Sequence, residues 1–181
     1  MSEIKLIAGV SVNADGIKKE YRIDDGKLTL TLSADDYKNF FKQAVAKFTE
    51  PMFFFIEVPK EDSEDEYDTY YLNCTVPVAK AILKRYGGIL FSDGIIRFGF
   101  GSEAGDEIYM QEFQRLDIYS NSLSKFEAIV KSLCYKNNPE AQTIWDVLSD
   151  DNPGMRECVE VDDESFEDII ENLTDVGLYQ G

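Results

Sequence analysis

Two different hydrophobic periods follow one another near the N-terminus, and together they limit what this chain can fold into. Apolar side chains alternate with polar ones over residues 4–12, 17–23 and 28–32, as they do in half-buried β-strands. Over residues 37–48 they recur instead every three or four positions, which indicates one apolar helix face. A chain that carries both periods is typical of an α+β protein.

Turn and cap signals divide these first elements. Asp15-Gly16 and Asp25-Gly26 lie between alternating segments, and Asp-Gly in that position predicts β-hairpins. Ser33 stands where a helix N-cap is expected, immediately before the helical period begins. The N-terminal third is therefore predicted to be a β meander that leads into a helix.

The rest of the chain continues both patterns and is expected to complete one domain. Strands are predicted over 52–58 (buried on both faces), 69–75, 107–112, 115–119 and 155–161, with a hairpin over 89–100 folded at Asp93-Gly94. Helices are predicted from Pro77 to a stop at Gly87-Gly88, over 123–133, after Asn138-Pro139, and from an Asp162 or Asp163 cap to Gly177. We therefore expect a single α+β domain over residues 1–181, with a mainly antiparallel sheet and about five helices.

Charge excludes some partners and favours another. The chain has 18 Lys and Arg against 35 Asp and Glu, a formal net charge of −17, and only 6 of its basic residues lie in 91–181. Phosphate backbones and anionic membranes are bound through Lys and Arg, so direct nucleic-acid or membrane binding is not expected. A basic protein partner is favoured, because a strongly negative surface attracts a positively charged protein and raises its rate of association. Solubility alone would also explain the excess.

The chain contains no histidine, which removes Ser-His-Asp and Cys-His catalysis and the zinc motifs that use histidine. Its three cysteines, Cys74, Cys134 and Cys158, lack the spacing of zinc ligands and are expected to be reduced thiols of a cytoplasmic protein. The N-terminus lacks a signal-peptide pattern. We expect no catalytic residue, cofactor or metal ion, although 35 acids leave a carboxylate-dependent hydrolase open.

Two acidic segments are the candidate partner-binding sites. The first is the segment 60–68, expected to be an exposed loop, with candidates Glu61, Asp62, Glu64, Asp65 and Glu66. The second is the last helix and its approach, with candidates Asp162, Asp163, Glu164, Glu167, Asp168 and Glu171. Like charges at helical spacing destabilise a helix, and only those near its N-terminus are offset by the helix dipole. A binding role for this C-terminal face is therefore favoured over a purely solvated one.

Several short stretches carry a family resemblance. They are Gly105–Tyr109, Ile118–Ser120, Thr143–Ser149 with Asn152-Pro153-Gly154, and the ending Gly177-Leu178-Tyr179. Together these resemble small uncharacterised bacterial proteins of the toxin-immunity type. The resemblance covers about the last 80 residues, and none of its motifs is catalytic. It implies a bacterial protein that is encoded beside a toxin and inhibits it.

These observations lead to one functional hypothesis and two alternatives. We expect a non-enzymatic acidic binding protein, an immunity-like inhibitor that neutralises a basic toxin or nuclease. One alternative is a nucleic-acid mimic that inhibits a DNA-binding protein, which requires carboxylates spaced like duplex phosphates. The other is a carboxylate-dependent hydrolase, which requires a cleft with two acids, one of raised pKa. The oligomeric state is left open by the sequence.

Overall fold

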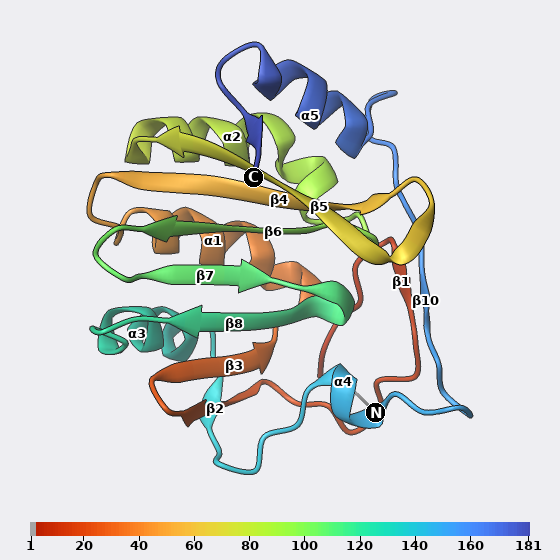
Figure 1. Ribbon diagram of the computed structural model, residues 1–181. Coiled ribbons are helices and arrows are strands. Elements are labelled where there is room, and N and C mark those ends of the chain that lie inside the picture. The colour runs from red at the N-terminus through yellow and green to blue at the C-terminus, as the bar shows by residue number, and fades with distance from the viewer. Residues whose placement is uncertain (1–2) are drawn as a thin grey trace.

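A computed structural model describes residues 3–181, apart from the side chain of Glu64. Within these residues nine strands form one mixed, mainly antiparallel sheet, in the order β11-β5-β4-β6-β7-β8-β3-β2-β9 (Figure 1). The strands of this sheet are β2 (Glu20–Asp24), β3 (Lys27–Thr31), β4 (Met52–Lys60), β5 (Ser63–Cys74), β6 (Arg97–Ser102), β7 (Glu107–Met110), β8 (Arg115–Tyr119), β9 (Lys136–Asn137) and β11 (Tyr179–Gln180). Only β2 and β9 pair in parallel. The predicted β meander is confirmed from residue 20 onward.

Five α-helices accompany the sheet in the described residues: α1 (Tyr37–Val45), α2 (Val76–Leu90), α3 (Ser124–Ser132), α4 (Ile144–Val147) and α5 (Phe166–Thr174). Short 3-10 turns, η1 (Ala34–Asp36) and η2 (Glu112–Gln114), precede α1 and β8. Helices α1, α2 and α3 all lie on one face of the sheet (Figure 1). The predicted α+β class, the antiparallel character of the sheet and the five helices are confirmed.

The hydrophobic core fills the space between the sheet and these three helices. Helix α1 buries the stripe that its sequence predicts, namely Tyr37, Phe40, Phe41, Ala44 and Val45. Alternate residues of the central strands meet it from the sheet, including Phe54, Ile56, Phe98 and Phe100. Because successive strand side chains point to opposite faces, the residues between them project from the other face of the sheet.

The predicted strand over 4–12 is wrong except at its end. Only β1 (Val10–Ser11) pairs, and its partner is β10 (Met155–Arg156), so the strand predicted over 155–161 is equally short. The side chain of Gln114 explains the irregular course of this segment. Its Oε1 accepts a hydrogen bond from the Ile7 amide at 2.9 Å, and its Nε2 donates to the carbonyls of Lys5 and Leu32 at 3.0 and 2.8 Å. The chain therefore gets several of its hydrogen bonds here from a side chain instead of a neighbouring strand.

Two further predictions fail because strand and helix continue where a break was expected. The segment 60–68 is not a loop: β4 reaches Lys60 and β5 begins at Ser63, so these acids lie on a β-hairpin. Helix α2 continues through both glycines to Leu90. The hairpin predicted over 89–100 is therefore wrong: only its second half is a strand, β6, and β6 pairs with β4 and β7. At Gly88 a Cβ would lie 3.1 Å from Val161 Cγ1, so the missing side chain lets the C-terminal segment approach.

The C-terminal region also differs from its prediction. Helix α5 begins after Ser165, whose hydroxyl accepts a hydrogen bond from the Glu167 amide, while Asp168 accepts one from the Ser165 amide at 2.8 Å. This is a capping box, so the caps predicted at Asp162 and Asp163 are wrong. Helix α4 likewise starts after Thr143, five residues beyond the predicted opening. None of the helices described in residues 3–181 combines the length and apolar character that a membrane crossing requires.

Candidate functional site

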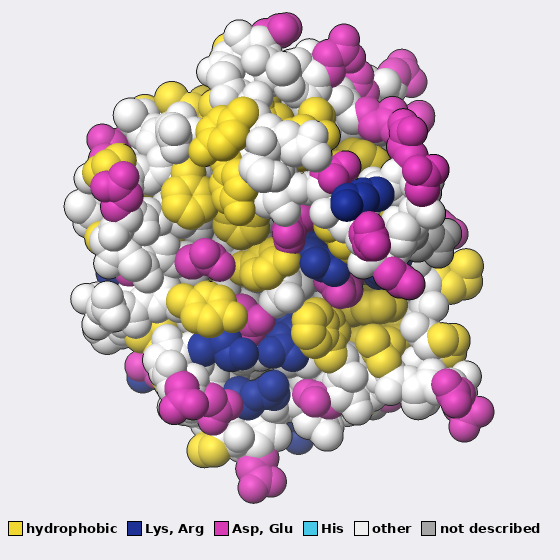
Figure 2. Space-filling view, viewed as in Figure 1, with side chains coloured by type: hydrophobic (Ala, Val, Ile, Leu, Met, Phe, Trp, Pro, Cys, Tyr) yellow, Lys and Arg dark blue, Asp and Glu magenta, His cyan; other side chains and the backbone are white. Residues whose placement is uncertain are grey.

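One face of the sheet has none of α1, α2 and α3 over it, and Figure 2 looks onto this face. Hydrophobic side chains gather on it over the part of the sheet formed by β4, β5 and β11, and basic side chains gather lower down, over the part formed by β8 and β3 (Figure 2). Acidic side chains are concentrated toward the edge where the β4–β5 hairpin and the segment before α5 lie. This uncovered face is the candidate site.

Five aromatic side chains from β11, β5, β4 and β7 lie on this face, and we call them the aromatic band: Phe53, Phe55, Tyr71, Tyr109 and Tyr179. Ring centroids are 6.0 Å apart for Tyr179 and Tyr71, 6.5 Å for Tyr71 and Phe55, and 5.4 Å for Phe55 and Tyr109. Phe53 contacts both Tyr71 (5.9 Å) and Phe55 (6.2 Å). Such separations and tilted orientations are those of favourable aromatic pairs. The band leaves accessible surface, since Tyr179 is 49% exposed.

Two glycines of β6 make the band continuous. Phe55 pairs with Gly99 and Phe53 with Gly101 across the β4–β6 ladder. A Cβ on Gly99 would lie 2.6 Å from Phe55 Cζ, and one on Gly101 would lie 2.4 Å from Phe53 Cζ. The rings therefore lie directly over a strand without side chains at these two positions. This close approach connects β4 aromatics to Tyr109 on β7.

A polar cluster adjoins the band at Glu57. The Glu57 carboxylate accepts hydrogen bonds from Tyr109 Oη and, at 3.0 Å, from Thr69 Oγ1. Arg97 donates to Glu112 at 2.8 Å, and its guanidinium lies 3.8 Å from the centre of the Tyr67 ring. Burial and the hydrogen bond to Glu57 raise the pKa of Tyr109 well above its usual value. Tyr109 therefore stays protonated, and the cluster acts as a fixed hydrogen-bonding surface.

One carboxylate beside this cluster has a raised pKa. Burial of Glu107, together with the negative charge of Glu57, raises the pKa of its carboxyl group above the ordinary value. The pair lies on the open face of the sheet, in register with Gly101 and Arg97. The two carboxylates are therefore electrostatically coupled on an open surface.

The first set of candidate acids occupies the β4–β5 hairpin. Glu61 and Asp62 form its turn, Asp65 and Glu66 follow on β5, and all four are exposed. Glu66 forms an ion pair with Lys60 at 3.3 Å. The side chain of Glu64 lies outside the described part of the structure. Three exposed carboxylates at the hairpin tip therefore have no ion pair to a described residue.

The second set divides into structural and free acids. Glu164 forms a bidentate ion pair with Arg85 of α2 at 2.7 and 2.8 Å, and this guanidinium lowers the pKa of Glu164. Asp168 is the capping-box carboxylate of α5. The remaining members are exposed and form no ion pair with a described residue: Asp162, Asp163, Glu167 and Glu171.

The structure brings the hairpin acids and the segment before α5 to the same edge of the molecule. The Arg156 guanidinium of β10 donates to Tyr67 Oη of β5 at 3.0 Å, which ties the strand before α5 to the hairpin. The intervening segment adds Glu157 and Glu160, two exposed acids that were not among the candidates. We call the exposed acids of the hairpin and of residues 157–163 the acidic edge. Its hairpin acids lie at the far end of β4 and β5, the strands that carry Phe53, Phe55 and Tyr71, and acidic side chains gather on this side of the face (Figure 2).

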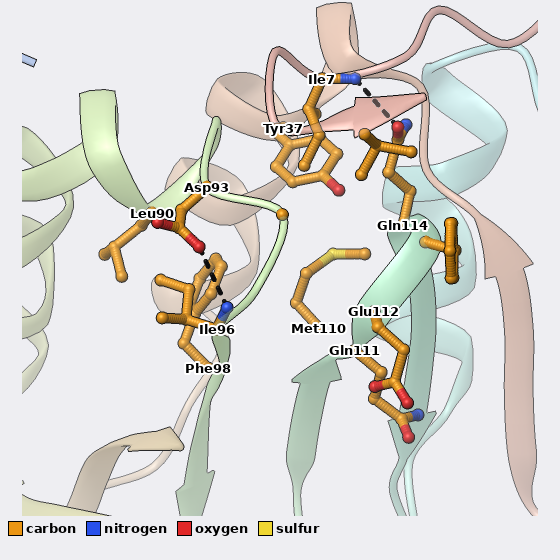
Figure 3. A pocket seen from close by; sticks show the side chains of 13 residues that line it. Ile7, Tyr37, Leu90, Asp93, Ile96, Phe98, Met110, Gln111, Glu112 and Gln114 are labelled. Carbon is orange, nitrogen blue, oxygen red and sulfur yellow. Dashed lines mark hydrogen bonds between the residues drawn. The ribbon is translucent and has the colours of Figure 1, made fainter. Parts of the chain in front are cut away.

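A small cavity lies elsewhere, below the loop between α2 and β6 (Figure 3). Its volume is about 10 Å³, which is about the space of one water molecule. Asp93 and Glu112 both line it, but they lie on opposite sides of the Met110 side chain (Figure 3). Asp93 accepts hydrogen bonds from the amides of Ile95 and Ile96, at 2.7 and 3.1 Å, and from that of Val159. Because burial outweighs these bonds, the pKa of Asp93 is raised; this acid holds the loop in place, and the cavity has no room for a substrate.

Sequence reasoning missed the aromatic band because residues 52–58 were expected to be buried on both faces. On this face Phe55 is buried as predicted, but Phe53 and Glu57 are only half-buried, so the prediction is wrong at these two positions. The sequence does contain a signal, the alternate glycines at 99 and 101. Their meaning depends on which strand lies beside β6, and no local pattern specifies that neighbour.

No group of three or more Cys, Asp or Glu side chains that could hold a metal ion is present in the part of the chain that the structure describes. Comparison with known proteins yields no matching family model, no matching curated protein and no matching solved structure. The functional argument therefore depends on the geometry of the uncovered face.

Proposed function

We propose that this chain is a non-enzymatic binding protein that docks a basic protein on its uncovered sheet face. The observation that carries the proposal is the aromatic band with the acidic edge beside it. The band would supply the buried contact, and the acidic edge would attract and orient the partner.

The composition of the face supports this role. Aromatic residues and arginine are enriched at protein interfaces and account for much of their binding energy. The rings of Tyr71 and Tyr179 adjoin each other, and Arg97 is held in place by Glu112. An exposed patch of grouped apolar side chains marks an interaction site more often than scattered ones do.

The charge distribution supports a basic partner. Residues 140–181 contain 13 acids and one basic residue, Arg156, and the exposed acids of 157–163 lie beside those of the hairpin. A cluster of one sign focuses the field and raises the rate of encounter with an oppositely charged protein. Steered association reaches about 10⁸–10⁹ M⁻¹s⁻¹ at low salt, against about 10⁵–10⁶ M⁻¹s⁻¹ without steering.

The more specific form of the proposal is an immunity-like inhibitor that acts in the cytoplasm and neutralises a basic toxin or nuclease. Its support is the resemblance of residues 105–120, 143–154 and 177–179 to bacterial toxin-immunity proteins. A nuclease cleft is basic because it holds a phosphate backbone, so the acidic edge complements it. This form predicts that a neighbouring gene encodes a toxin, and that co-expression of this chain restores growth of a host that expresses the toxin. Absence of such a gene, or failure to restore growth, would reject this form.

The general proposal is tested with three variants and one purified partner. The wild-type chain is used to capture proteins from native lysate at low salt, and the retained basic protein is purified. Association and dissociation rates are then measured by surface plasmon resonance. The edge variant is Glu61→Gln/Asp62→Asn/Asp163→Asn, the band variant is Tyr71→Ser/Tyr179→Ser, and the control variant neutralises three distant exposed acids, Asp15→Asn/Glu103→Gln/Glu140→Gln.

We expect the edge variant to reduce the association rate by about tenfold at low salt, because steering depends on local charge. The band variant should increase the dissociation rate, because buried aromatic contacts control it. The control variant, with the same net charge as the edge variant, should stay within about twofold of wild type if position governs steering. Equal effects of the edge and control variants would reject the acidic edge, and unchanged dissociation of the band variant would reject the aromatic band.

A further inference from the structure

A second surface lies on the helix-covered side of the molecule, away from the aromatic band. A groove of about 770 Å³ runs between α1 and α2. Its floor is formed by Leu83, Gly87 and Phe91. Four exposed lysines form its rims, Lys38 and Lys42 from α1 and Lys80 and Lys84 from α2. We call this feature the lysine groove.

The floor of the lysine groove is apolar and fixed. The Phe91 ring stacks on Phe41 of α1, with centroids 5.6 Å apart and an interplanar angle of 17°. A Cβ on Gly87 would lie 3.0 Å from the Phe91 ring, so the glycine allows the ring to lie against α2. Glycine destabilises a helix interior relative to alanine, but at Gly87 the absence of a side chain leaves the groove open above the helix backbone. Leu83 and Phe91 are only half-buried, so apolar surface remains accessible.

The four lysines have no acidic neighbour in the groove. None of them forms an ion pair with any acid of residues 3–181 whose side chain is described, and no acid lines the groove. Yet the chain has 35 acids and a net charge of −17. Lysines four residues apart on one helix repel each other, and this arrangement occurs twice, on facing helices. The groove is therefore a local concentration of uncompensated positive charge above an apolar floor.

We propose that the lysine groove binds a small amphiphile with a phosphate head and a single apolar chain. Its volume is within the range of about 300–1,000 Å³ that small-molecule sites occupy. Lysine binds phosphate as a flexible point charge, and a phosphate monoester carries a charge of about −1.5 to −2 at neutral pH. Two lysines on each rim can surround such a head from both sides, while the apolar chain covers Leu83 and Phe91.

The net charge of the protein favours a small ligand over an acidic protein or an anionic membrane. Long-range repulsion grows with the charge of the approaching body. A body with many negative charges would meet the field of the whole chain at −17. A single phosphate head brings about two charges, and the local attraction of four lysines outweighs the repulsion on so small a ligand.

The test uses isothermal titration calorimetry of the full chain with n-dodecyl phosphate below its micelle concentration at pH 7.5. The groove variant is Lys38→Gln/Lys42→Gln/Lys80→Gln/Lys84→Gln. The control variant removes four lysines elsewhere, Lys18→Gln/Lys27→Gln/Lys47→Gln/Lys136→Gln, so both variants have the same net charge. A third variant, Leu83→Asn, reduces the apolar floor without changing charge. Thermal unfolding of each variant verifies that it is folded.

Wild type should bind the probe, the control variant should stay within threefold of it, and the groove variant should bind at least tenfold more weakly. Leu83→Asn should weaken binding at least threefold. Inorganic phosphate should bind far more weakly than n-dodecyl phosphate, because it cannot use the floor.

Four results would overturn the proposal. They are absence of binding by wild type, equal loss in the control and groove variants, inorganic phosphate as tight as n-dodecyl phosphate, and binding only to phosphatidylglycerol vesicles. The last result would assign the groove to a membrane surface instead of a free amphiphile.

Discussion

Replacing Gln114 with leucine tests the clamp that holds the N-terminal segment. Gln114 is 1% exposed and bonds three backbone groups, the Ile7 amide and the carbonyls of Lys5 and Leu32. Leucine keeps the size of the side chain and removes all three bonds. A buried donor without a partner costs about 1–3 kcal/mol. The Lys5 carbonyl retains its hydrogen bond from the Ala34 amide, so the two carbonyls add less to the loss of stability than the Ile7 amide does.

The expected loss is therefore about 2–4 kcal/mol in the free energy of unfolding, out of the roughly 5–15 kcal/mol that holds a typical domain together. It is measured by urea unfolding followed by the fluorescence of Trp145, the only tryptophan. Trp145 reports on the same region, since its Nε1 donates to the Glu112 carbonyl at 2.8 Å. Gln43→Leu is the matched control, because Gln43 bonds only Asn39 of its own helix.

Gln114→Glu separates the hydrogen bonds from the shape of the side chain. A carboxylate can still accept from the Ile7 amide, but its second oxygen would face the carbonyl oxygens of Lys5 and Leu32. Burial and these dipoles would raise the pKa of the new carboxyl group in the folded state. A raised folded pKa stabilises the fold at low pH, and this stability is lost as the pH increases through it. Gln114→Glu should therefore be less stable than wild type at pH 7 and approach it as the pH falls.

The clamp would be refuted if Gln114→Leu changed the free energy of unfolding no more than Gln43→Leu does. It would also be refuted if the Gln114→Glu deficit were independent of pH. Hydrogen exchange supplies a local measurement, since the Ile7 amide should lose protection in Gln114→Leu even where global unfolding is rare.

Three further outcomes are expected. Glu107→Gln should stabilise the fold at pH 7, because burial and the charge of Glu57 penalise only the charged form of the Glu107 carboxyl. This gain should disappear as the pH falls through the raised pKa of Glu107, because the wild-type carboxyl then becomes neutral. Urea unfolding at several pH values measures the difference in the free energy of unfolding. Gly94→Ala should destabilise the fold strongly, since its Cβ would lie 1.9 Å from the Gly9 carbonyl oxygen, and a melting temperature within about 2 °C of wild type would contradict that packing. Cys74 should be the slowest of the three thiols to react with a disulfide reagent at pH 8. Burial raises the pKa of Cys74 to about 11, so only about one molecule in a thousand carries the reactive thiolate at that pH. Mass spectrometry of the labelled cysteines identifies the order of reaction.

The elements that could be predicted from the sequence are those whose signals are local. The stripe of α1 needs only its own residues, and the Asp-Gly turn at 25–26 sets the β2–β3 register without help from the rest of the chain. The irregular path over residues 4–9 could not be predicted, because its hydrogen bonds come from residues far along the chain, among them Ser33, Ser92 and Gln114. The same holds for the end of α2, where Gly88 faces Val161.

The candidate sites follow the same division. The acids at 61–66 and 162–171 are visible in the sequence, but only the tertiary structure shows that Glu164 serves the fold by pairing with Arg85. Asp168 caps α5 through Ser165, three residues before it, which is a local signal. The aromatic band arises where five neighbouring strands, β11, β5, β4, β6 and β7, lie side by side, and the lysine groove where two helices face each other. Each helix alone shows one ordinary pair of lysines. Convergence of such pairs depends on helix packing, which no spacing within the chain reveals.

The net charge of −17 conceals an asymmetry that bears on both proposals. Acids gather at the edge of the uncovered sheet face, while unpaired lysines line a groove between α1 and α2 on the covered side. A basic partner would be drawn to the acidic edge and repelled by the lysine groove, so the two surfaces together favour one orientation at encounter. A small anion would be drawn the opposite way. Because screening limits each field to about 10 Å at 0.1 M salt, the position of the charges decides where each ligand arrives, and the two surfaces can be occupied independently.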